Sequence, residues 1–126
     1  MVAVTRLRVV LGCAVLAMLV SCAPAPAATR LEITTNETVC GGMYNPDVPL
    51  CRTSPASRTV RISMGRNAVA AGTTGSDGRL VVAVPAGELV VSIPDAQPYM
   101  NCDAPTVTSV SGRTTPVVQT CTLLLP

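Results

Sequence analysis

From residue 30 onward, apolar and polar residues alternate in short runs, separated by segments that contain glycine and proline. An alternation of period two sends successive side chains to opposite faces of the backbone, which is typical of half-buried β-strands. No stretch after residue 30 has the spacing of an amphipathic helix. The sequence therefore predicts an all-β fold, a sandwich of about seven short strands covering residues 30–126.

The alternation also predicts which side chains form the core. Four runs supply them: Leu31 and Ile33; Val60, Ile62 and Met64; Leu80, Val82 and Val84; and Leu89, Val91 and Ile93. The third run is apolar on both faces, which predicts a central position in its sheet. Residues 75–78 and 85–87 are predicted to be tight turns joining three successive strands, with Gly78 at positive φ. Residues 40–57 and 94–105 are predicted to be long loops, and residues 107–110 and 114–124 to be the last strands.

The amino terminus has the layout of an export signal. Arg6 and Arg8 form a short basic region, and residues 9–20 are uncharged and mostly apolar. A helix of that length rises about 18 Å, too little to cross a hydrocarbon core of about 30 Å, so the run is interpreted as the apolar part of a cleaved signal.

The segment Leu19-Val20-Ser21-Cys22 that follows resembles the bacterial lipobox. In lipoproteins the cysteine of that motif receives a diacylglyceryl group and becomes the first mature residue. The resemblance implies that residues 1–21 are a signal peptide, that Cys22 is the lipidation site, and that residues 22–29 are an anchor and Pro/Ala-rich tether. Two or three acyl chains give a stable attachment to a membrane.

An ordinary cleavable signal is the alternative for the same segment. Ala23-Pro24-Ala25 and Ala25-Pro26-Ala27 both have the small-x-small pattern that precedes cleavage in soluble secreted proteins. After removal of residues 1–21, seven arginines face seven acidic residues, so the mature chain is formally neutral. A neutral domain with scattered charges has no electrostatic footprint for nucleic acid, and none is expected as a partner.

Cysteine usage agrees with export. Of six cysteines, Cys13 lies in the signal and Cys22 is the proposed lipid site, which leaves Cys40, Cys51, Cys102 and Cys121. Four cysteines in an oxidising compartment predict two disulfides with three possible connectivities. The pairs Cys40–Cys51 and Cys102–Cys121 are favoured because each brackets its own loop, and each should contribute about 3 kcal/mol.

Few side chains offer catalytic or metal chemistry. The chain has no histidine and no lysine, so serine has neither partner that usually activates it as a nucleophile. We expect no catalytic residue, no cofactor and no metal site. The turn at Asp77 lacks the repeated acidic ligands of a calcium loop, and Asp95 and Asp103 are interpreted as solubilising loop residues. Asn36-Glu37-Thr38 matches a glycosylation sequon, which is expected to be incidental here.

Residues 72–91, with a Thr-rich start, the Asp77-Gly78 turn and the Pro85-Ala86-Gly87 turn, resemble the carboxypeptidase regulatory-like family. The resemblance extends over about residues 58–125 and implies a prealbumin-like (transthyretin-like) Greek-key sandwich with no active site. Leu80 and Leu89 stand where that family usually has an aromatic residue.

Two functions are consistent with these features. The first is a monomeric, membrane-anchored module that binds an envelope protein or polymer, or has a structural role in the envelope. The second is a secreted inhibitor of an extracellular hydrolase that presents the disulfide-bracketed, proline-containing loop between Cys40 and Cys51. An enzyme is not expected.

Overall fold

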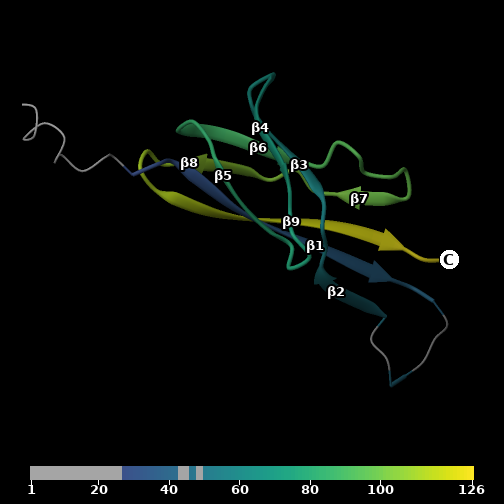
Figure 1. The fold of residues 1–126 in the computed structure, drawn as a ribbon. Helices are drawn as coiled ribbons and strands as arrows, with labels where there is room; N and C mark the ends of the chain where they lie inside the picture. The colour runs from purple at the N-terminus through teal and green to yellow at the C-terminus, as the bar shows by residue number, and fades with distance from the viewer. Residues whose placement is uncertain (1–26, 43–45, 48–49) are drawn as a thin grey trace, which may run out of the picture.

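The computed structural model describes residues 27–42, 46–47 and 50–126 (Figure 1). The predicted signal peptide and Cys22 lie outside the described residues. Within them the chain forms strands and no helix: β1 (Arg30–Cys40), β2 (Cys51–Pro55), β3 (Thr59–Met64), β4 (Asn67–Thr73), β5 (Arg79–Ala83), β6 (Gly87–Ser92), β7 (Met100–Cys102), β8 (Thr106–Ser109) and β9 (Thr114–Leu124). The predicted all-β fold is confirmed.

The first and last strands form the middle of a five-stranded sheet. β1 and β9 are parallel and stay in register over eleven residue pairs, from Arg30 beside Thr114 to Cys40 beside Leu124. The other edge of β1 is shared, because its first half pairs with β5 and its second half with β2, both antiparallel. β7 adds to the far edge of β9 near its end. At about 3.3 Å per residue, β1 and β9 are each roughly 35 Å long.

The remaining four strands form a second sheet in the order β4-β3-β6-β8, all antiparallel. The core lies between the two sheets. Its eight buried side chains come from both: Leu31, Ile33, Val60, Ile62, Val84, Leu89, Val91 and Val117. Met64, Leu80, Val82 and Ile93 pack against them and are half-buried. The inward-facing sets expected from the alternation are therefore confirmed.

The two turns around β5 differ from the sequence prediction. β4 belongs to the four-stranded sheet and β5 to the five-stranded sheet, so residues 74–78 carry the chain from one sheet to the other. Residues 84–86 return the chain to the four-stranded sheet, where it continues as β6. The turns join three successive strands, as expected, but these strands do not lie side by side in one sheet, because turn residues specify a change of direction but not which strand edge the chain joins.

β5 itself is not central. It pairs only with β1, and Val81 on its outer face is 51% exposed. The apolar outer face that suggested a central position therefore faces solvent.

The strand number was also underestimated. The segment expected as one loop over residues 40–57 contains β2, whose five residues are all exposed. The loop over residues 94–105 contains the three-residue strand β7. Neither strand buries an alternating apolar face against the other sheet, so neither leaves a hydrophobic period in the sequence.

The start of the described chain is hydrogen-bonded to the turn between β8 and β9. Thr29 Oγ1 accepts a hydrogen bond from the Gly112 amide at 3.0 Å, and the Arg30 amide donates to Arg113 O at 3.0 Å. No helix in the described part is long and apolar enough to span a bilayer.

Candidate functional site

Both disulfides join cysteines that lie opposite each other on neighbouring strands. Cys40 of β1 is bonded to Cys51 of β2, and Cys102 of β7 to Cys121 of β9, which is the pairing expected from the sequence. Cys121 is buried, whereas Cys51 is exposed. Disulfides are typical of oxidising compartments, so this pair points to an extracytoplasmic location.

The largest polar cluster of the described residues is centred on Thr35, which is fully buried in β1. Along β1, the pairing with β5 stops at Thr34 and the pairing with β2 starts at Asn36, so Thr35 lies between the two partners. Its amide donates to Gly78 O at 2.7 Å, and its carbonyl accepts from the Ala56 amide at 3.1 Å. The backbone of Thr35 is therefore hydrogen-bonded both to the turn before β5 and to the segment after β2.

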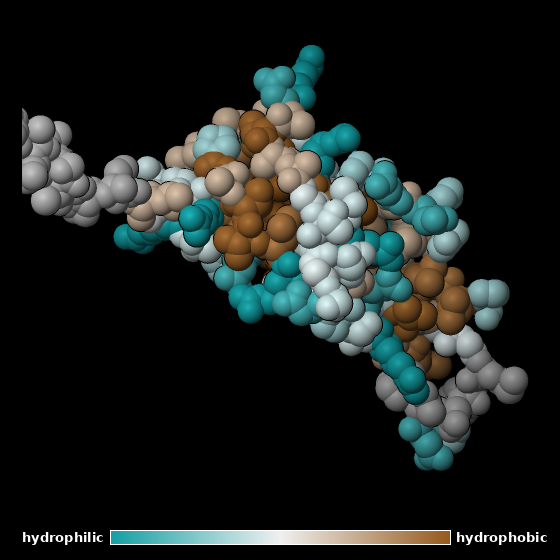
Figure 2. Space-filling view, viewed as in Figure 1, coloured by the Kyte–Doolittle hydropathy of each residue, from teal (hydrophilic) through white to brown (hydrophobic). Residues whose placement is uncertain are grey.

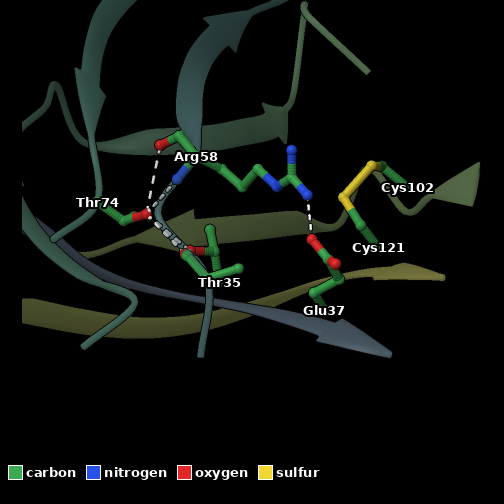
Figure 3. A network of polar contacts seen from close by, with 7 residues as sticks. Thr35, Glu37, Arg58, Thr74, Cys102 and Cys121 are labelled. Atoms are coloured by element: carbon green, nitrogen blue, oxygen red, sulfur yellow. Dashed lines mark hydrogen bonds and ion pairs between the residues drawn. A yellow bond between two sulfur atoms is a disulfide. The ribbon is translucent and has the colours of Figure 1, made fainter. Parts of the chain in front are cut away.

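The hydroxyls at this junction form a chain of hydrogen bonds (Figure 3). Thr74 Oγ1 accepts from the Arg58 amide at 2.8 Å and lies 2.7 Å from Thr35 Oγ1, which donates to Ala56 O at 2.5 Å. The geometry allows one proton per hydroxyl if Thr74 donates to Thr35. Ser57 Oγ adds a donation to Thr74 O at 2.6 Å. The cluster therefore ties the loop before β3 to the segment after β4 and to β1.

Arg58 extends this cluster across the sandwich. Its guanidinium forms an ion pair with Glu37 of β1, and in Figure 3 the two side chains lie beside the Cys102–Cys121 disulfide. Both side chains are about one quarter exposed. Arg58 Nε is buried and has no hydrogen-bond partner among the described residues.

Gln119 is a second polar side chain inside the sandwich. It is fully buried in β9, next to Thr35 in the strand register. Its Nε2 donates to Asp103 O at 2.7 Å and to Val91 O at 3.3 Å. Its Oε1 has no partner among the described residues. Gln119 therefore links the five-stranded sheet to β6 of the other sheet through backbone carbonyls.

The turn at Asp77 is held by its own backbone. Asp77 Oδ1 accepts from the Arg79 amide at 3.0 Å, and the Gly78 amide donates to Gly75 O at 2.9 Å. Gly78 has a φ of +75°, as expected from the sequence. An aspartate whose oxygen caps the amide two residues on is a common turn arrangement.

We expect Asp77→Asn to change the free energy of unfolding by less than about 0.5 kcal/mol, because the amide oxygen of asparagine can accept the same hydrogen bond. Asp77→Ala, which has no acceptor, should cost about 0.5–1.5 kcal/mol. Thermal melts with and without added calcium check both values. A calcium-dependent rise in melting temperature that Asp77→Asn removes would identify the turn as a metal site.

The other acidic candidates are not brought together. Asp103 Oδ1 accepts from the Thr120 amide at 2.8 Å, which fixes the residue after β7 to β9. Asp95 is exposed in the loop after β6. Asn36 of the sequon lies within β1 between β2 and β9. No group of three metal-ligating side chains occurs among the described residues.

Sequence reasoning missed the polar cluster, although a signal for it exists. The alternation that predicts Leu31 and Ile33 as inward-facing continues to Thr35, and in β9 it runs from Val117 to Gln119 and Cys121. A polar residue at an inward position of an apolar period indicates a buried polar group that needs partners. Arg58 immediately precedes β3 and Thr74 immediately follows β4, so the alternation of a strand does not extend to either residue.

The chain was compared with protein-family models, with curated proteins and with solved structures, and none of the three comparisons found a match.

Proposed function

We propose that this protein is a membrane-anchored, extracytoplasmic β-sandwich module with a binding or structural role in the cell envelope. The lipobox-like segment ending at Cys22 would supply the anchor, and residues 22–29 the tether. The resemblance of residues 58–125 to carboxypeptidase regulatory-like domains agrees with a scaffold whose loops and faces bind.

One feature of the fold supports this proposal most directly. The described chain enters at the start of β1, and the Cys40–Cys51 disulfide lies at the other end of that strand, about 35 Å away (Figure 1). Exposed apolar side chains gather at this far end, where β1 and β9 finish (Figure 2). Leu124 lies beside Cys40 in the strand register, Leu50 O accepts from the Gly41 amide, and both leucine side chains are more than half exposed. A domain tethered at its amino terminus would therefore present this end away from the membrane.

We expect the exported protein to partition into the detergent phase with added acyl mass, and Cys22→Ser to abolish both. Cys13→Ser is the matched control, because Cys13 lies within the apolar run of the signal, upstream of the proposed cleavage site before Cys22. Detergent phase separation and intact-mass spectrometry of the exported chain measure the outcome. A mature chain that begins after Ala25 or Ala27 without acyl mass would contradict the anchor.

The inhibitor hypothesis is tested on the same material. Extracellular proteases assayed with the purified chain should keep their activity if the protein is an envelope module. Stoichiometric inhibition that is lost on cleavage of the loop between Cys40 and Cys51 would favour the inhibitor instead.

A further inference from the structure

Two rows of uncharged polar side chains cross the outer face of the five-stranded sheet. The strand register aligns one row over β7, β9, β1 and β2 and places the second row two residues earlier in β9 and β1. Because side chains alternate across a strand, all six point away from the core. We call them the outer polar face: Asn101, Thr122, Thr38 and Thr53 in the first row, and Thr120 and Asn36 in the second.

Most hydrogen-bonding groups of the outer polar face are unused. The hydroxyls of Thr38 and Thr53 lie 2.8 Å apart. The other four side chains form no hydrogen bond with any residue in the part of the chain that the structure describes. The face therefore offers hydroxyl and amide groups, each of which can donate and accept.

The outer polar face carries little charge. None of its six side chains is ionisable, and the exposed carboxylate of Asp103 lies beside Thr120 at its edge. Arg79 and Glu32 form an ion pair of 2.7 Å on the same side of the sheet, and the Asp103 carboxylate accepts from the Thr120 amide. The carboxylate at the edge disfavours a polyanion, and a partner that matches the six polar groups is neutral and rich in hydroxyl groups.

The spacing favours a repeating partner over a single small molecule. Neighbouring strands lie about 4.8 Å apart, and side chains on one face recur about every 6.7 Å along a strand, so the six groups form a lattice. Tyr99 is 61% exposed and immediately precedes β7, which carries Asn101. An exposed aromatic ring beside such a lattice supplies an apolar, flat surface with a polar tip.

We propose that the outer polar face binds a neutral polysaccharide chain, with the threonine and asparagine side chains hydrogen-bonding the sugar hydroxyls and Tyr99 stacking on a sugar ring. This inference rests on the proposed envelope function and names the class of polymer that the module holds. The first row lies in the half of β1 that is remote from the tether, where a polymer outside the membrane is accessible.

The test measures depletion of the exported chain, kept in detergent, onto insoluble neutral polysaccharides (cellulose, chitin and a cross-linked dextran) and onto cross-linked pectate as a polyanion. We expect retention on at least one neutral polysaccharide and none on pectate. The double variant Thr38→Val/Thr122→Val removes two hydroxyls without changing side-chain shape and should weaken retention about tenfold. Tyr99→Ala should weaken it to a similar extent.

The matched control is Thr59→Val/Thr73→Val, which removes an exposed cross-strand hydroxyl pair from the outer face of the other sheet. It should bind as the unmodified chain does. The proposal is overturned if no neutral polysaccharide retains the chain, if pectate retains it equally, or if the control weakens binding as much as Thr38→Val/Thr122→Val. A concentration-dependent dimer that Thr38→Val/Thr122→Val abolishes would instead show that the face is an interface between two copies of the chain. Detergent partitioning that depends on Cys22 would survive all of these failures, so the anchor and the polysaccharide are tested separately.

Discussion

Replacing Gly78 with alanine is expected to lower the free energy of unfolding by about 2–5 kcal/mol. A Cβ at this position would lie 2.5 Å from Thr35 O and 3.2 Å from the Pro55 Cβ. The positive φ alone costs an alanine about 1–2 kcal/mol. Relief of the clash would displace the bond from the Thr35 amide to Gly78 O, and an unpaired buried backbone group costs a further 1–3 kcal/mol. The same logic makes Gly78→Val, with its β-branched side chain, at least as damaging.

Gly65→Ala is the control that separates backbone conformation from crowding. Gly65 also has a positive φ, of +60°, but a Cβ there would meet nothing within 4 Å. Its substitution should cost only about 1–2 kcal/mol. Denaturant unfolding of the two variants measures the difference, and equal losses would show that the close approach of Gly78 to Thr35 does not constrain the fold.

The prediction at Gly78 shows what the sequence could and could not provide. Asp77-Gly78 identifies a turn with a positive φ from local chemistry, and the structure confirms it. That the turn docks on Thr35, 43 residues away in the chain, depends on which strands share β1. Local patterns carry no such information, and for this reason the crossing of the chain between the sheets was not foreseen.

Strand pairing limits the prediction of the candidate site in the same way. The apolar periods identified Leu31, Ile33, Leu89 and Val91 because burial in a two-layer fold depends mainly on alternation. The polar groups that join the layers come from segments distant in sequence, such as Arg58 and Glu37. The outer polar face is likewise visible only once β1 and β9 are known to be parallel and in register.

The hydroxyl of Thr35 should be the most costly buried polar group to remove. Thr35→Val keeps the shape of the side chain but removes the 2.5 Å donor of Ala56 O and the 2.7 Å partner of Thr74 Oγ1, which leaves the 3.1 Å contact between Thr74 Oγ1 and Ala56 O as the replacement. Thr74 is buried and Ala56 is half-buried, so we expect a loss of about 1–3 kcal/mol in the free energy of unfolding. Thr74→Val should cost about as much, since it also removes the acceptor of the Arg58 amide.

The pair of variants forms a double-mutant cycle. If the hydroxyls act as one chain, Thr35→Val/Thr74→Val should cost about 1–2 kcal/mol less than the sum of the single losses, because the bond between the two hydroxyls is counted in both single variants but lost only once in the double variant. Thr38 and Thr53 supply the matched exposed pair, with hydroxyls 2.8 Å apart on the outer face of the same sheet. Water replaces either partner there, so Thr38→Val should change stability by less than about 0.5 kcal/mol. Urea unfolding of the full set measures these differences. Additive losses at Thr35 and Thr74 would mean that each hydroxyl serves its own carbonyl and that the cluster is not cooperative.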